Sequence, residues 1–288
     1  MKTHTLDVGD ADIVYDVEGD LPAPNGQRPL LMIGQPMDAS GFRALAGYFP
    51  DRVVVTYDPR GIARSTRRDG RVDSSPTVQS EDLHALVGAL GAGAVDVFAS
   101  SGGAVTALAW VATHPDDVAV LVAHEPPLAN VLPDAQFAER AMEGFRDAYI
   151  AGGFGAGMAA FIAMTSWRGE FTEEFLAAPR PDPAMFGLPT GDDGSRDDPL
   201  LSDRSRPVTD YRPDFAALNT APTHIVLGFG EESDGVFTGR AAVAVAERLG
   251  HAAVVFPSHH GGFSAEDSGY PGKPEAFAKV LRAALQSE

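Results

Sequence analysis

A serine flanked by very small residues is the feature of this sequence best suited to do chemistry. Residues 95–104 form an apolar run that ends at Ser100 and Ser101 and continues with helical spacing. A serine hydroxyl can be lifted clear of a sheet on a strained strand-to-helix turn, which tolerates only small side chains two positions before and after it. Ala99 and Gly103 meet this requirement around Ser101, whereas a bulky phenylalanine lies two positions before Ser100. The pattern therefore predicts Ser101 as a nucleophile for acyl transfer.

The nucleophile requires a base, and two adjacent histidines are the candidates. A serine hydroxyl reacts poorly at neutral pH, so it needs a base within hydrogen-bond reach and an acid that orients the base. His259 and His260 lie in a glycine-rich loop after the last predicted strand. From such a loop a base can reach over the edge of a sheet. The residues alone leave both histidines open.

The elements that must position these residues follow from the hydrophobic pattern. Short apolar runs alternate with amphipathic segments, the pattern of a mostly parallel sheet flanked by helices. The predicted strands are 13–17, 30–33, 53–56, 95–98, 118–123, 225–227 and 253–256. The predicted helices are 42–48, 78–90, 103–113, 135–150, 158–167, 240–249 and 274–285. This alternation predicts an α/β fold.

The alternation is interrupted between residues 127 and 218. We expect a core of residues 1–126 and 219–288, with residues 127–218 as a helical cap or lid. The aromatic and methionine side chains of this cap need cover, and its inner face could line an apolar pocket. Residues 181–214 are dense in proline and aspartate, and we expect them to form a surface loop.

Composition narrows the function classes. The chain has 288 residues, 44% of them hydrophobic, a net charge of -18 and no cysteine. The absence of cysteine excludes disulfides, thiolate metal sites and a cysteine nucleophile. The negative charge argues against binding of nucleic acid or of anionic membranes, and it favours a neutral or apolar small molecule. The first ten residues lack a signal-peptide pattern and no run approaches ~20 apolar residues, so we expect a cytoplasmic protein.

Four further blocks carry recognisable motifs. They are Leu31-Met32-Ile33-Gly34-Gln35-Pro36, Tyr57-Asp58-Pro59-Arg60-Gly61-Ile62-Ala63-Arg64-Ser65, the pair His114-Pro115, and Phe256-Pro257-Ser258-His259-His260-Gly261-Gly262-Phe263. Together with the serine turn they resemble the α/β-hydrolase family. In order, they resemble its H-G-x-P oxyanion turn, its D-x-R-G-x-G-x-S block, its usual spacing from the nucleophile to a His-Pro pair, and its histidine loop. Ile33 replaces the histidine of the first motif, and Ala63 replaces a glycine of the second.

The resemblance implies a fold and several site residues. The implied fold is a mostly parallel central sheet flanked by helices, with a helical cap inserted after the sixth strand. Family loops usually place the histidine before a small residue and a following aromatic, which favours His260 over His259. The oxyanion formed by attack on a carbonyl needs preorganised backbone donors. The resemblance assigns these to the N–H groups of Gln35 and Gly102.

The acid of the triad is implied by the same resemblance, with an alternative left open. The family commonly has a G-x-x-D turn after the penultimate strand, but residues 230–233 read G-E-E-S, with a serine in the place of the acid. Glu125 instead follows Ser101 by 24 positions. This resembles the arrangement in haloalkane dehalogenases and in zearalenone-type lactonases. We expect Glu125 as the acid, with Glu232 or Asp234 as the alternative.

These residues together lead to an expected activity. The resemblance implies a serine hydrolase, with no cofactor and no metal, that cleaves a carboxylic ester or lactone of an apolar small molecule through an acyl-enzyme on Ser101. The alternative is a non-hydrolytic or weakly hydrolytic protein on the same fold. Such a protein would bind a ligand, or would act as a biosynthetic cyclase or lyase with His260 as acid and base. Nothing in the sequence indicates the oligomeric state.

Overall fold

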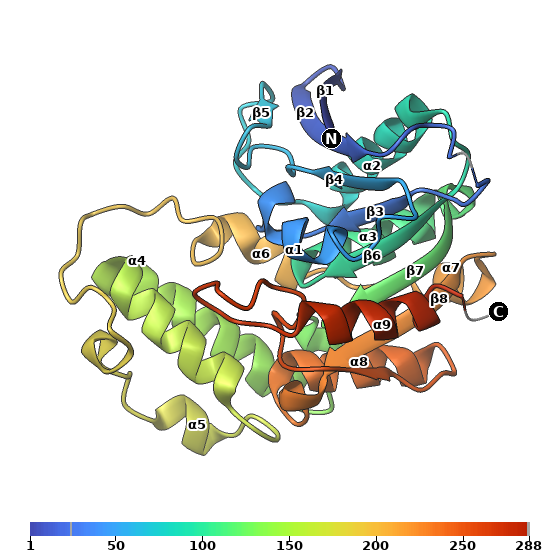
Figure 1. Ribbon diagram of the computed structural model, residues 1–288. Coiled ribbons are helices and arrows are strands. Elements are labelled where there is room, and N and C mark those ends of the chain that lie inside the picture. The colour runs from blue at the N-terminus through green and yellow to red at the C-terminus, as the bar shows by residue number, and fades with distance from the viewer. Residues whose placement is uncertain (24, 287–288) are drawn as a thin grey trace.

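A single sheet runs through the computed structural model, which describes residues 1–23 and 25–286 (Figure 1). Nine strands of the described chain form this sheet: β1 (Lys2–Asp7), β2 (Ala11–Glu18), β3 (Leu30–Ile33), β4 (Val54–Tyr57), β5 (Thr66–Arg67), β6 (Val95–Ser100), β7 (Val118–His124), β8 (His224–Gly230) and β9 (Val254–Phe256). The order is β1-β2-β4-β3-β6-β7-β8-β9, with β5 paired to β2. Strands β1, β2 and β5 pair antiparallel, and every pair from β4 to β9 is parallel. The predicted α/β fold with a mostly parallel sheet is confirmed.

The central strands are apolar because both faces of the sheet are covered. In β3, Leu31 and Ile33 belong to one hydrophobic cluster, whereas Leu30 and Met32 belong to the other. Side chains alternate between the faces of a strand, so near-continuous apolar runs are typical of strands buried on both sides. The sheet therefore separates two hydrophobic cores.

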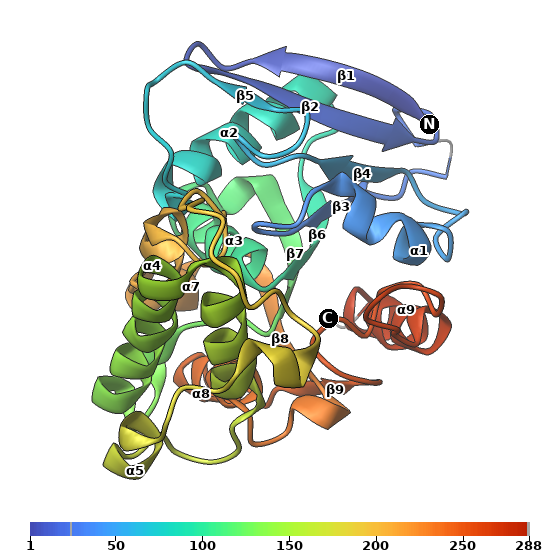
Figure 2. The ribbon, with the colours of Figure 1, turned by 90° about the vertical axis from the view of Figure 1, so that its left-hand side faces the viewer.

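Helices cover both faces of the sheet. They are α1 (Arg43–Ala46), α2 (Pro76–Leu90), α3 (Gly102–Thr113), α4 (Ala135–Ser166), α5 (Glu173–Ala177), α6 (Arg206–Thr209), α7 (Phe215–Thr220), α8 (Phe237–Arg248) and α9 (Pro274–Ala284). Apolar residues of α2, α3 and α8 belong to one core, and those of α1 and α9 to the other. Figure 2 shows α2 and α3 on one side of the sheet and α1 and α9 on the opposite side.

The chain leaves the sheet between β7 and β8. The two-residue strand β5 lies off the main strand path, and without it β7 is the sixth strand along the chain. In residues 127–218 the chain forms α4, α5, α6 and the first part of α7. This segment is here called the helical insertion, and its helices α4, α5 and α6 stand beside the carboxyl ends of the parallel strands, whereas α7 lies at their other end (Figure 1). Ligand sites in open α/β sheets lie at that end of the strands.

Helix α4 reverses its direction at a glycine. Gly153 has φ 77° and ψ -167°, which are not helical values. The rings of Phe145 and Phe161 then pack edge to face with centroids 5.4 Å apart, so the two halves of α4 run back along each other. By length and mean hydropathy alone, α4 could cross a membrane, a property that we did not expect from the sequence. Core helices of globular proteins meet the same criteria, so this property does not define a membrane segment.

The structure contains several elements that were not predicted from the sequence, namely β1, β5, α5 and α7, and one segment that differs from its expected form. Strand β1 was not predicted, because none of its residues is fully buried and it forms an edge of the sheet, so its sequence has no apolar run. Residues 181–214 were expected to form a surface loop, but this expectation is wrong in part. They include α6, and Leu201 and Val208 are buried in the main core. The apolar side chains of this segment are too widely spaced to show a helical period.

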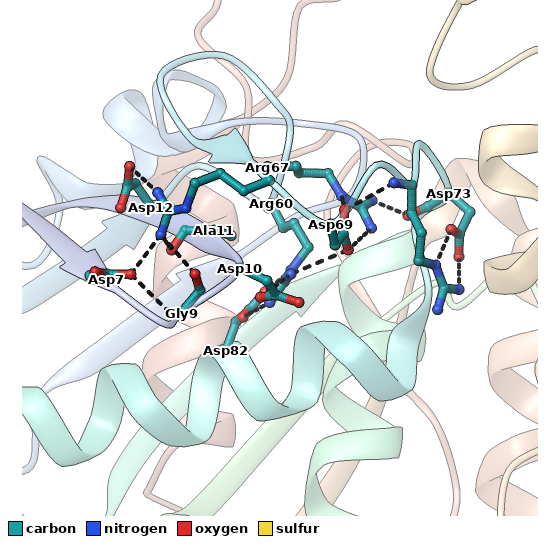
Figure 3. A network of polar contacts seen from close by, with 12 residues as sticks. Asp7, Gly9, Asp10, Ala11, Asp12, Arg60, Arg67, Asp69, Asp73 and Asp82 are labelled. Carbon is teal, nitrogen blue, oxygen red and sulfur yellow. Dashed lines mark hydrogen bonds and ion pairs between the residues drawn. The ribbon is translucent and has the colours of Figure 1, made fainter.

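An arginine cluster ties the loop after β4 to its surroundings (Figure 3). The Arg60 guanidinium donates to both carboxylate oxygens of Asp82 on α2, at 2.9 and 2.5 Å, and to Asp10 at 2.6 Å. The side chains of Arg60 and Asp82 are only 5% and 1% exposed. Arg60 belongs to the block that resembles the D-x-R-G motif. The contacts give this arginine a structural role, since it joins the β1–β2 turn, the β4 loop and α2.

We expect Arg60→Met to destabilise the fold strongly, because it leaves the Asp82 carboxylate buried without its partner. The free energy of unfolding should fall by about 3–5 kcal/mol. Arg71→Met is the matched control, since Arg71 makes the same two-pronged contact to Asp73 but its side chain is 53% exposed. That change should cost less than about 1 kcal/mol. Equal losses in urea denaturation of the two variants would contradict this account.

Candidate active site

Ser101 occupies a strained turn between β6 and α3. Its φ of 57° and ψ of -128° lie in a region that a residue with a side chain rarely adopts. The Ser101 N–H donates to the His124 carbonyl of β7 at 2.9 Å, which fixes the turn to the neighbouring strand. Ser100 is the last residue of β6 and is only 1% exposed. Of the two serines, Ser101 is therefore the one that faces the cavity described below.

The residues after Ser101 must be glycines because backbone passes directly beside them. A Cβ on Gly103 would lie 2.6 Å from the Ile33 carbonyl oxygen, and one on Gly102 would lie 2.7 Å from the Gln35 carbonyl oxygen. The start of α3 therefore packs against the loop after β3. Gln35, Gly102 and Ser101 line the same cavity. The Gln35 side chain is fixed by its amide nitrogen, which donates to Ser74 Oγ at 2.6 Å.

The two candidate histidines have different partners. His260 Nδ1 lies 2.6 Å from Glu125 Oε2. The ring of His259 instead packs on Tyr270, with centroids 3.8 Å apart, and its Nε2 lies 2.9 Å from the Pro271 carbonyl oxygen. The structure therefore pairs Glu125 with His260 and engages both nitrogens of His259 in its own loop, since His259 Nδ1 accepts from a backbone N–H. Because Glu125 engages Nδ1 of His260, the other ring nitrogen, Nε2, is available to a different partner.

The carboxylate of Glu125 is fully buried and saturated with contacts. Glu125 directly follows β7, has φ 50° and is 0% exposed. The Gly230 N–H donates to its Oε1 at 2.9 Å, and the Thr238 hydroxyl donates to Oε2, which also contacts His260. Glu232 and Asp234 are exposed, and the structure describes no contact of either carboxylate with His260. The arrangement favours Glu125 over these two alternatives.

Glu125 and His260 shift each other's protonation. Burial acts to raise the pKa of Glu125, but the charge and hydrogen bond of His260, together with the charge of His124 and the hydrogen bond of Thr238, hold that pKa below its usual value. Burial acts to lower the pKa of His260, but the charge and hydrogen bond of Glu125 raise it overall. The neighbouring His124 lies 3.9 Å from Glu125 Oε1 without a hydrogen bond, and burial outweighs the charge of Glu125 and lowers the pKa of His124 to about 4. Near neutral pH the pair therefore holds an ionised carboxylate beside the imidazole.

Sequence reasoning missed the two groups that hold Glu125 besides His260. Thr238 lies at the start of α8, and Gly230 ends β8. Thr238 is 113 positions from Glu125, and neither its residue type nor its spacing signals a role. Gly230 opens the G-E-E-S turn noted in the sequence. Its donor is a backbone N–H, which every residue except proline carries, so the sequence gives no signal for this contact. These contacts could be found only from the fold.

The site opens on a cavity of about 810 Å³ between the sheet and the helical insertion. Ser101, His260, Gln35 and Gly102 line one side of it. The remaining wall is mostly apolar and includes Met142, Phe145, Phe161, Ile162, Met164, Leu200, Val208, Val236 and Phe237. A cavity of this size and lining suits a small apolar molecule with few polar groups.

One group of side chains outside this cavity could hold a metal ion. His84, His114 and Asp117 offer ligand atoms within 4.8 Å of one another. His84 already contacts Asp117 at 2.7 Å, and His114 contacts Glu81 at 2.9 Å. The cluster lies at the carboxyl end of α3, whereas Ser101 lies at its amino end. It therefore has no part in the Ser101 site.

The fold and the site together are typical of one class of enzyme. A nucleophile turn, an acid and a histidine in this chain order on a mostly parallel sheet are typical of α/β hydrolases. A family profile described as the α/β hydrolase fold matches residues 12–261. The chain therefore belongs to the α/β-hydrolase family and is a hydrolase of this fold.

Comparison with individual proteins agrees with this assignment. The uncharacterized hydrolase YraK of Bacillus subtilis (strain 168) is 31% identical over 267 residues, which cover 90% of each chain. A thermophilic esterase from Thermogutta terrifontis, solved with malate bound, is 19% identical with a TM-score of 0.65, and 99% and 98% of the two chains are covered. Est816, described as an N-acyl homoserine lactone degrading enzyme, is 18% identical with a TM-score of 0.61 over 97% and 99%. At these identities the two solved structures show the shared fold alone.

The Glu125–His260 contact predicts a measurable shift in the His260 titration. Glu125→Gln removes the charge that raises the pKa of His260 and leaves the burial that lowers it, so this pKa should fall. Glu232→Gln and Asp234→Asn are the controls, and each should leave it nearly unchanged. NMR titration of the His260 ring would measure all three. An unshifted His260 pKa in Glu125→Gln, or an equal shift in a control, would contradict the assignment.

Proposed function

We propose that the protein hydrolyses a carboxylic ester or lactone of a largely apolar small molecule through an acyl-enzyme on Ser101. The observation that carries this proposal is that the strained Ser101 turn and the Glu125–His260 pair open on one apolar cavity. The esterase and the lactone-degrading enzyme among the structural neighbours are consistent with it. With a net charge of -18, we expect neither nucleic acid nor an anionic membrane as a partner.

The first half of the reaction forms the acyl-enzyme. Ser101 Oγ attacks the carbonyl carbon while His260 Nε2 takes the hydroxyl proton, because Nδ1 is engaged by Glu125. The negative charge on the carbonyl oxygen is met by the N–H groups of Gly102 and Gln35, which line the cavity beside Ser101. The intermediate then collapses, and His260 returns the proton to the leaving oxygen. For a lactone this oxygen stays on the same molecule.

The second half releases the acid. His260 takes a proton from water, whose oxygen attacks the acyl carbon, and Ser101 leaves with the proton returned from His260. In both halves His260 becomes an imidazolium for a moment. Glu125 stabilises that cation and stays ionised, because the pKa of its buried carboxylate is held low. The base must start neutral, so activity should fall as the pH drops through the raised pKa of His260.

Ser101→Ala tests the proposed function directly. With short-chain 4-nitrophenyl esters, kcat/KM should fall by a factor of about a thousand or more, because the acyl-enzyme can no longer form. Ser100→Ala is the matched control, since it makes the same change at the buried neighbour, and it should retain most of the activity. Esterase activity retained in Ser101→Ala would overturn the proposal. It would also favour a protein in which His260 acts as acid and base without a nucleophile.

A further inference from the structure

A buried arginine stands behind one wall of the cavity. Arg146 lies on α4 beside Phe145, which lines the cavity, and is only 4% exposed. Its Nη2 donates to Thr209 Oγ1 at 2.6 Å and to Ser205 Oγ at 3.5 Å. Both hydroxyl-bearing residues line the cavity themselves. The guanidinium is therefore one side chain away from a molecule that contacts Ser205 or Thr209.

Arg146 has no ion pair in the described part of the chain, although its guanidinium lies over the Phe145 ring, 5.0 Å from the ring centroid. Among the residues that the structure describes, no carboxylate lies within 4.0 Å of its guanidinium, and its Nε is buried without a hydrogen-bond partner. The acidic groups that act on it from further away, Glu143, Asp203 and Asp210, are all exposed to solvent. A buried ion without a partner is costly to a fold. A negatively charged group bound near Arg146 would therefore reduce this cost.

The two hydroxyl groups can connect the guanidinium to a bound ligand through hydrogen bonds. In this structure Ser205 donates to the Leu200 carbonyl at 2.7 Å and lies 3.2 Å from the Ser202 carbonyl. Thr209 donates to the Arg206 carbonyl at 3.1 Å and has a longer contact of 3.5 Å to the exposed Asp210 carboxylate. Each hydroxyl accepts from Arg146, and rotation about its C–O bond would turn its single proton to an anion bound against these two residues. A chain from the guanidinium through a hydroxyl to an anion strengthens each hydrogen bond along it.

We propose that the Ser205–Thr209 wall, with Arg146 behind it, is a subsite for a carboxylate of the substrate. This inference rests on the proposed function and specifies its substrate class, an apolar ester or lactone that also carries one acidic group. The wall lies close to the reacting centre. A Cβ on Gly102 would be 3.1 Å from Val208, which neighbours Thr209 on α6.

The overall negative charge does not exclude an acidic substrate. The net charge of -18 repels an anion at long range, but salt screens exposed charges beyond about 8 Å at physiological ionic strength. The Arg146 charge, which has no ion pair among the described residues, is buried beside the cavity, where screening by salt is weak. A bound carboxylate would therefore interact mainly with Arg146.

A matched set of esters tests the subsite. The probes are mono-4-nitrophenyl esters of adipic, pimelic and suberic acid, each paired with the same ester bearing a terminal carboxamide in place of the carboxylate. The pairs share their size and reacting group and differ in charge. We expect the unmodified protein to prefer the acid in kcat/KM by about tenfold to a hundredfold for at least one chain length. No preference at any length would overturn the proposal.

Variants locate the source of the preference. Arg146→Met should reduce it to within about twofold while the amide esters keep their rates, and Arg146→Lys should retain part of it. Arg206→Met is the control for a nearby exposed charge and should keep the preference. Arg168 also lines the cavity, where it donates to the backbone carbonyl of Glu232. If Arg168→Met removed the preference and Arg146→Met did not, the proposed subsite would be wrong.

The thermal stability of Arg146→Met distinguishes a role of Arg146 in binding from a purely structural role. Because the buried charge has no counter-ion, Arg146→Met should keep the Tm of the ligand-free protein or raise it. A much lower Tm together with an equal loss of rate on acid and amide esters would show a structural arginine and contradict the proposal.

A binding measurement separates failure of the subsite from failure of the proposed function. Monomethyl suberate should raise the Tm of Ser101→Ala more than its carboxamide counterpart does, and Arg146→Met in the same background should abolish the difference. If this result holds but no ester is hydrolysed, the proposed function fails and the anion subsite stands. If esters are hydrolysed through Ser101 but no such difference exists, the subsite alone fails.

Discussion

The site depends on one buried carboxylate. Glu125 has no contact with solvent, so each of its oxygens must find a donor within the protein. His260, the Gly230 N–H and the Thr238 hydroxyl supply these donors from a loop, a strand and a helix that are far apart in the chain. The carboxylate can be satisfied only when all three elements are in place. The same contacts hold the imidazole of His260 at the cavity that Ser101 lines.

Two buried arginines of this fold, Arg60 and Arg146, have different kinds of partner. Arg60 meets Asp82 with two hydrogen bonds, and the pair joins segments that must stay together. Arg146 is equally buried but has no ion pair among the described residues; it donates to the hydroxyls of Ser205 and Thr209 beside the cavity and lies over the Phe145 ring. Where a charge serves stability, the protein supplies the opposite charge itself. Where a charge stands behind a binding wall, that partner is missing, and we assign its place to a ligand.

How much of this site the sequence predicts depends on how far apart along the chain the contacting residues lie. The strained turn at Ser101 was predictable because the rule for such a turn involves only residues two positions away. Glu125 and His260 are joined across 135 positions, and they could be proposed only through a family resemblance. Thr238 carried no signal, since any hydroxyl placed there by the fold could donate. Arg146 carried a weak signal, a charge on the apolar face of a predicted helix, but its partners lie in a segment expected to be a surface loop.

Covalent trapping of Ser101 is the sharpest test of whether this serine is a nucleophile activated within the site. A fluorophosphonate reacts with an activated serine hydroxyl and leaves a stable phosphonyl group on its oxygen. Intact-protein mass spectrometry should show a single adduct, and peptide mapping should place it on Ser101. An adduct on any other residue, or no adduct with the folded protein, would contradict the account.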